Sequence, residues 1–120
     1  MPSAEDIKKT VNRYIELLGG GSADDIAALY AQDAVVEDPV GGEVHRGRAA
    51  VHGFYAAIES AQRQCELLTL RVAGNEAAFQ FRLTIGGAMR IEPIDVMVFD
   101  DDGEIASMKS YWGQENVASL

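Results

Sequence analysis

Apolar residues recur at spacings of three and four near the start of the chain, over residues 7–18. This is the period of an amphipathic helix, which buries one face against the rest of the protein. Ser3 and Asp6 resemble a capping box at its beginning, and three glycines at 19–21 end it. A first helix is therefore predicted, with Tyr14 on its inner face.

The same spacing predicts two further helices in the first half of the chain. The second begins at Ser22 and stops near Asp33, with Tyr30 on its inner face. The third covers residues 51–58 and has Tyr55 on its inner face. A short strand is predicted between these two helices.

The pattern changes to alternation of apolar and polar residues from about Gln64, which is typical of strands with one buried face. Glycine-containing turns at 73–75, 86–87 and 100–103 divide this half into hairpin-connected strands, one of them over residues 88–99. Helices in one half and hairpin strands in the other predict an α+β fold. At 120 residues, one domain over the whole chain is expected.

Composition narrows the class of protein and its partners. The chain is 48% hydrophobic and 24% charged, as in ordinary globular proteins, and its formal net charge of -9 disfavours nucleic acid and anionic membranes as partners. The one cysteine, Cys65, can form no internal disulfide, and no Cys/His cluster has the spacing of a metal site. With neither a leader peptide nor a membrane-spanning run, a cytoplasmic protein is expected.

Two carboxylates interrupt the apolar run of the short strand. Residues 34–36 are apolar, and Glu37 and Asp38 follow before Pro39 ends the run. Alternation places Asp38 on the side of Val36 and Glu37 on the other side, so one acid shares a face with valine. Periodicity does not decide which acid faces inward, and Asp38 also suits a turn or cap before proline.

Asp95 is the second conspicuous acid, because both faces of the predicted strand are apolar around it, within residues 92–99. Burial of an ionised carboxylate is costly, so Asp95 should find a strong partner or remain protonated through a raised pKa. Core packing explains each of the inward tyrosines Tyr14, Tyr30 and Tyr55 taken separately. Taken together, buried hydroxyls need hydrogen-bond partners, and the other tyrosines and the two acids could provide them. An ionised carboxylate beside a neutral acid and a phenol can move a proton next to a carbonyl group, without a nucleophile, metal or cofactor.

Segments spread from the first predicted helix to the C-terminus carry a family resemblance. They are residues 12–17, 28–39, 53–55, 93–97 and 110–112, the last followed by Glu115 and Asn116. In this pattern the chain resembles the bacterial Δ5-3-ketosteroid isomerases, within the nuclear transport factor 2-like, or SnoaL-like, group. The resemblance implies a cone-shaped α+β fold of three N-terminal helices on a curved, mostly antiparallel sheet, and a homodimer.

The resemblance also implies an activity and its residues. The activity is that of a steroid delta-isomerase, which moves the double bond of a 3-oxo-Δ5-steroid into conjugation without a cofactor. Asp38 would be the general base, Tyr14 and protonated Asp95 would stabilise the dienolate, and Tyr55 and Tyr30 would continue the hydrogen-bond chain. A flat apolar steroid needs an apolar cavity, and the candidates for its wall, each of which also suits the core, are Leu18, Phe54, Ile58, Phe81, Leu83, Ile91, Met97, Met108 and Trp112.

Other functions remain open on the sequence alone. Enzymes of the same fold group with cyclase-like, epoxide hydrolase-like or dehydratase-like chemistry use different inward polar residues. A non-catalytic binder of small apolar molecules, or a dimerisation module, is also compatible, because a fold does not determine a function. His45 and His52 have no partner pattern and are expected at the surface.

Overall fold

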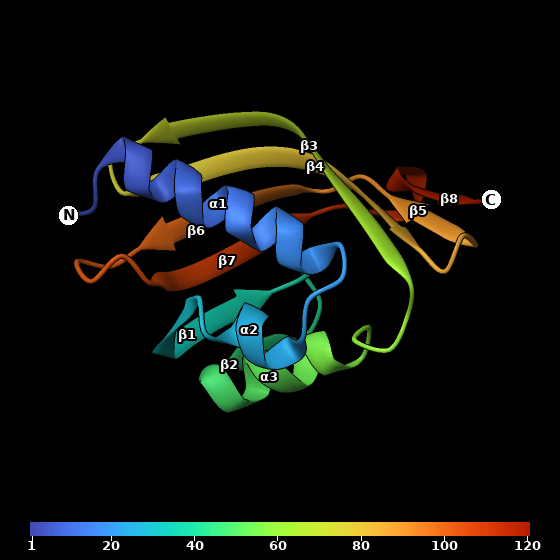
Figure 1. The fold of residues 1–120 in the computed structure, drawn as a ribbon, viewed down its shortest axis with the longest axis horizontal. Helices are drawn as coiled ribbons and strands as arrows, with labels where there is room; N and C mark the ends of the chain where they lie inside the picture. Colours follow the sequence, from blue (N-terminus) through green and yellow to red (C-terminus); the bar gives the residue numbers. More distant parts are fainter.

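The computed structural model describes residues 1–120 as three helices and a curved sheet (Figure 1). The helices are α1 (Ala4–Leu18), α2 (Ala23–Ala27) and α3 (Arg48–Ala56). The strands are β1 (Tyr30–Glu37), β2 (Val44–Arg46), β3 (Arg63–Ala73), β4 (Glu76–Ile85), β5 (Met89–Ile91), β6 (Ile94–Phe99), β7 (Ile105–Tyr111) and β8 (Val117–Ser119), and a 3-10 helix, η1 (Gln114–Asn116), precedes β8. The predicted α+β class is confirmed, and no helix has the length and apolar character to cross a membrane.

The strands form one sheet in the order β2-β1-β7-β6-β4-β5-β8, with β3 paired to β4. Every pairing is antiparallel except that of β1 with β7. Helix α1 crosses the concave face against β3 and β4, while α2 and α3 pack on each other beside β1 (Figure 1). The core lies between α1 and this face, where Val11, Phe79 and Phe99 are almost completely buried.

The first helix begins and ends as predicted. The Ser3 hydroxyl accepts a hydrogen bond from the Asp6 N–H at 3.1 Å, which satisfies one of the free donors at the helix start. Ile7, Val11, Tyr14 and Leu18 are buried, as the spacing requires. The N–H of Gly19 bonds back to the last turn and ends the helix.

The second helix is shorter than predicted, and Tyr30 does not belong to it. Helix α2 ends at Ala27, and Tyr30 is the first residue of β1. Its strand pairs in parallel with β7, opposite Ile105, and the Ile105 N–H donates to the Leu29 carbonyl at 2.9 Å. Pairing with a distant strand therefore overrides the helical spacing of this segment.

Three local features of the sheet also differ from the prediction. The strand predicted over residues 88–99 is broken at Pro93, which has no N–H for a central ladder, so β5 and β6 are separate. The glycine-rich segment before α3 contains β2, which pairs with β1. A register shift between Leu67 and Thr69 turns Leu68 outward, so the alternation of β3 changes phase there.

A buried arginine joins the sheet to the ends of two helices. Arg63 is only 5% exposed, and it donates to the carbonyls of Leu18 at 2.9 Å, Ile58 at 2.7 Å, Gly21 at 2.7 Å and Leu17 at 3.4 Å. The acceptors lie at or just beyond the C-termini of α1 and α3, where carbonyls lack helical partners and carry partial negative charge. Arg63 thus satisfies both ends without a carboxylate.

Replacement of Arg63 by Met should therefore destabilise the protein strongly. Four buried or partly buried carbonyls would lose their donor, and a loss on the order of 3 kcal/mol in the free energy of unfolding is expected. Urea denaturation measures it, with Arg71→Met, at an exposed position of the same strand, as the control. Equal stability of the two variants would show that the Arg63 contacts do not hold the helix ends.

Candidate active site

A cavity of about 450 Å³ lies between the helices and the concave face of the sheet. Its wall is mostly apolar, and its charged or amide side chains are Asp38 and Gln114. Residues from α1, α3, the end of β1, the strands β4 and β5, and the C-terminal segment meet here. The lining residues are Tyr14, Leu18, Asp38, Phe54, Tyr55, Ala57, Ile58, Phe81, Leu83, Ile85, Met89, Ile91, Pro93, Trp112, Gln114 and Val117.

Most of the predicted wall residues line this cavity, but Met97 and Met108 do not. These two face each other across β6 and β7, and both are 0% exposed. They lie on the inner face of the sheet within the hydrophobic core, farther along the strands than the cavity reaches, so their assignment to its wall was wrong. From β5 and the C-terminal segment, only Ile91 and Trp112 were predicted. The wall residues that the sequence pattern missed are Ala57, Ile85, Met89, Pro93, Gln114 and Val117.

Asp38 follows directly on β1 and lines the cavity, on the same side of the strand as buried Val36. The Trp112 indole N–H donates to its Oδ1 at 2.7 Å. Burial raises the pKa of Asp38, and the Trp112 and Ser110 side chains and the nearby His45 oppose that rise. A half-buried carboxylate with a single strong donor can both accept and release a proton.

Glu37, the other acid of this strand, does not line the cavity. Its Oε2 accepts a hydrogen bond from the Gly41 N–H at 2.9 Å, and this bond closes the turn after β1. The side chain is therefore occupied by local structure. Of the two acids that periodicity could not separate, the structure places Asp38 in the cavity wall.

Three tyrosines form a continuous hydrogen-bonded chain. The hydroxyls of Tyr14 and Tyr55 are 2.8 Å apart, and those of Tyr55 and Tyr30 are 2.5 Å apart. Tyr14 and Tyr55 line the cavity, while Tyr30 lies behind them with 0% exposure. Burial raises the pKa of all three phenols, so they are neutral donors at physiological pH. Because each hydroxyl polarises the next, the chain strengthens the terminal donor.

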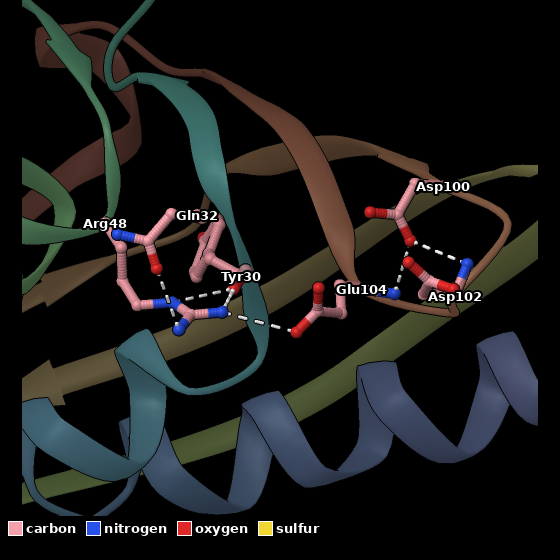
Figure 2. Close-up of polar contacts among 6 residues, drawn as sticks. All are labelled: Tyr30, Gln32, Arg48, Asp100, Asp102 and Glu104. Carbon is pink, nitrogen blue, oxygen red and sulfur yellow. Dashed lines mark hydrogen bonds and ion pairs between the residues drawn. The ribbon is translucent and has the colours of Figure 1, made fainter.

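Arg48 connects the element that carries Tyr55 to the strand that carries Tyr30 (Figure 2). At the start of α3, its Nε and Nη2 both donate to the Tyr30 carbonyl, at 3.0 and 2.6 Å. The same guanidinium contacts the Gln32 side chain and the Glu104 carboxylate, each at 3.3 Å. These contacts fix the position of α3 relative to β1, and with it the alignment of the tyrosine chain.

The acidic turn beside Arg48 is explained by its own structure (Figure 2). Asp100, Asp102 and Glu104 bring carboxylate oxygens within 4.8 Å of one another. The Asp100 carboxylate accepts the backbone N–H groups of Asp102 at 3.0 Å and Glu104 at 2.9 Å, as a turn-forming aspartate does. Glu104 is in addition paired with Arg48.

Asp95 is completely buried on the inner face of β6, and it does not belong to the cavity wall. Its cross-strand neighbours are Phe79 on β4 and Ser110 on β7, and the Phe79 ring lies 6.2 Å from the Tyr14 ring. Neither carboxyl oxygen of Asp95 has a hydrogen-bond partner. Burial raises its pKa well above the usual value, and the charge of Asp38 adds to the rise.

The remaining candidate groups have structural explanations. His52 is partly exposed, with 43% of its side-chain surface accessible, and lies 2.7 Å from the Asp24 carboxylate, as expected for a residue at the surface. His45 is also half-buried, and its ring lies 4.7 Å from that of Phe54, because β2 brings it against α3. Burial raises the pKa of the Cys65 thiol to about 12, which leaves it unreactive at neutral pH.

Fold and cavity together define a cone-shaped α+β protein with an internal site for a small apolar molecule. The chain belongs to the SnoaL-like domain family, which matches residues 11–108. It is 48% identical over 110 residues to the steroid Delta-isomerase of Nocardioides simplex, an alignment that covers 89% of each chain. This relationship confirms the resemblance seen in the sequence motifs and shows that the chain is an enzyme.

A solved structure shares the complete fold. It is that of SalBIII, an epoxide hydrolase/cyclase-like enzyme with a role in pyran ring formation in the polyether salinomycin. The two chains superpose with a TM-score of 0.92 over 100% of each, at 25% sequence identity. The scaffold is therefore common to enzymes of different chemistry, and the side chains of the cavity must distinguish them.

The raised pKa of Asp95 predicts how its replacement changes stability with pH. Below the unfolded pKa, near 4, the carboxyl is protonated in both states, and above it only the unfolded state ionises, so stability is lost as pH rises toward the folded pKa. Asp95→Asn removes this loss. Relative to wild type, its free energy of unfolding should increase with pH above pH 5, by at most about 1.4 kcal/mol per pH unit, until the pH reaches the folded pKa. Denaturation from pH 4 to 8 measures the difference, and a difference independent of pH would contradict a protonated Asp95.

Proposed function

We propose that this enzyme is a steroid Δ5-isomerase, which moves the double bond of a 3-oxo-Δ5-steroid to the conjugated Δ4 position. The observation that carries the proposal is the Asp38 carboxylate, which faces an apolar cavity together with the hydroxyl of Tyr14. The relative of 48% identity bears the name of this activity. A cavity of about 450 Å³ suits a small flat molecule, and its apolar wall suits a steroid.

The reaction needs one base and an acceptor for negative charge. Asp38 removes a proton from C4, the C4–H electrons form the dienolate with its charge on the C3 oxygen, and the same carboxyl returns the proton to C6. No atom is gained or lost, so neither a cofactor nor a metal is needed. Because a carboxylate is a far weaker base than the dienolate carbon, the intermediate must be stabilised by donors at its oxygen.

Tyr14 and Asp95 are the proposed donors to that oxygen. Tyr14 stands at the end of the tyrosine chain, so its hydroxyl is polarised by Tyr55 and Tyr30. Asp95 would be the second donor, since burial keeps it protonated and its oxygens have no partner within the protein. Trp112 would hold the Asp38 carboxylate toward the substrate through its 2.7 Å hydrogen bond.

Two alternative functions lack a comparable observation. Epoxide hydrolase/cyclase-like chemistry is known for the SalBIII scaffold, but that chain is more distant at 25% identity. A passive binder of apolar molecules would have no use for Asp38, Tyr14 and Asp95 together, because burial of two carboxyls costs stability. The isomerase assay below separates the proposed activity from both alternatives.

Neutral replacements of the neighbouring acids Asp38 and Glu37 should change the proposed isomerase activity differently. The wild type, without added cofactor, should convert 5-androstene-3,17-dione to the conjugated ketone, seen as growing ultraviolet absorbance. Asp38→Asn should lose on the order of 10²- to 10⁴-fold in kcat, since it removes the general base. It should still bind a phenolic steroid that mimics the dienolate, because the donors remain.

The control for this experiment is Glu37→Gln, which keeps the oxygen that accepts from Gly41 and should retain turnover. No absorbance rise with the wild type would exclude the steroid reaction. Equal turnover of Asp38→Asn and wild type would exclude Asp38 as the base.

The proposed assembly is a homodimer formed through the outer face of the sheet. Ile94 and Tyr111 are opposite each other on β6 and β7 and are both 48% exposed, and Val96 and Val98 alternate onto the same face. The helices pack elsewhere, so nothing within the chain covers this apolar surface (Figure 1). A second copy of the chain would bury this surface.

Light scattering after size-exclusion chromatography tests the assembly. The expected mass of wild type is twice the 12.9 kDa of one chain, and Ile94→Lys should shift it toward 12.9 kDa, since a buried ammonium without a partner opposes the contact. Leu120→Lys, at the exposed C-terminal residue, is the control and should stay dimeric. A monomeric wild type would contradict the assembly.

A further inference from the structure

Arg63, Asp95 and Ser110 are the buried polar or charged residues of the chain. Arg63 is satisfied by four carbonyls. The other two are not, since Asp95 Oδ1, Asp95 Oδ2 and Ser110 Oγ all lack a hydrogen-bond partner. Buried polar groups without partners are rare and destabilising, so these atoms need an explanation.

The unsatisfied atoms belong to residues that face each other. Asp95 on β6 and Ser110 on β7 are direct cross-strand partners, both 0% exposed on the inner face. Side chains of directly opposite residues have Cβ atoms about 4.5–5.5 Å apart. Rotation of the short Ser110 side chain can therefore direct its hydroxyl to the Asp95 carboxyl.

Ser110 is also near Asp38, since its carbonyl accepts the N–H of Val40, two residues beyond Asp38, at 2.9 Å. Its hydroxyl opposes the rise in the pKa of both carboxyls. A hydroxyl has only one proton to donate. Asp38 Oδ1 already accepts from Trp112, whereas neither oxygen of Asp95 accepts from any group. A hydrogen bond from Ser110 to Asp95 would therefore supply a carboxyl group that has no other partner, whereas Asp38 already has one.

We propose that Ser110 is a positioning residue for Asp95, to which its hydroxyl donates at the carbonyl oxygen. The inference rests on the proposed isomerase function, in which protonated Asp95 is the second donor to the dienolate. With its carbonyl oxygen held by Ser110, the O–H of Asp95 is left free to point away from β7 toward the substrate oxygen. Hydrogen bonding at the carbonyl also polarises the carboxyl group and makes its O–H a stronger donor.

A kinetic test uses Ser110→Ala, Asp95→Ala and the double variant. Ser110→Ala should lower kcat roughly two- to tenfold, the range of one neutral hydrogen bond, with KM nearly unchanged. In the Asp95→Ala background the same change should have no further effect. Ser110→Thr, which keeps the hydroxyl, should restore most of kcat, and Ser107→Ala, on the opposite face of the same strand, should leave it unchanged.

An infrared measurement tests the contact in the ligand-free protein, independently of any activity. The C=O stretch of protonated Asp95, assigned by its absence in Asp95→Ala, should move to higher wavenumber in Ser110→Ala and stay in place in Ser107→Ala. An unmoved band would overturn the proposal, as would a rise of the base pKa in the kcat/KM profile of Ser110→Ala, which would assign the hydroxyl to Asp38. A shifted band in a protein without isomerase activity would instead reject the proposed function and keep the contact.

Discussion

Desolvation of two carboxyl groups beside one apolar cavity is the constraint on which the rest of the structure depends. Asp38 and Asp95 are both removed from water, and burial raises the pKa of each. Two negative charges cannot be kept close together in such surroundings, so their environments must differ. Asp38 reaches the cavity and accepts a strong hydrogen bond from Trp112, whereas Asp95 is fully enclosed. The first environment favours the carboxylate and the second the neutral acid.

The scaffold keeps this difference by means of polar contacts at the ends of its elements. Arg63 donates to the carbonyls of Leu18 and Ile58 near the ends of α1 and α3, and both of these residues line the cavity. Arg48 ties the start of α3 to the backbone of Tyr30, and so aligns the tyrosine chain. The apolar wall can thus enclose a hydrophobic molecule while a few fixed donors face it, which is the arrangement that stabilises developing charge without reorganisation.

Much of the fold was predictable because its signals are local. The capped periodicity of α1 and the alternation of β4 required no knowledge of distant contacts. The errors had two causes. Pairing with the distant strand β7 places Tyr30 in a strand instead of a helix, and Pro93 interrupts a segment whose apolar pattern looked continuous. Asp95 was conspicuous from its apolar neighbours alone. The donor role of Trp112 and the isolation of Ser110 were not predictable, because hydrogen-bond partners across strands are set by register and not by spacing.

The two carboxyls should differ in protonation at neutral pH. A ¹³C NMR pH titration tests this in the protein labelled at the aspartate carboxyl carbons, with resonances assigned by Asp38→Asn and Asp95→Asn. At pH 7 the Asp95 resonance should have the chemical shift of a carboxylic acid, and the Asp38 resonance that of a carboxylate. Two ionised carboxyls at pH 7, or two that titrate together, would contradict this difference in protonation.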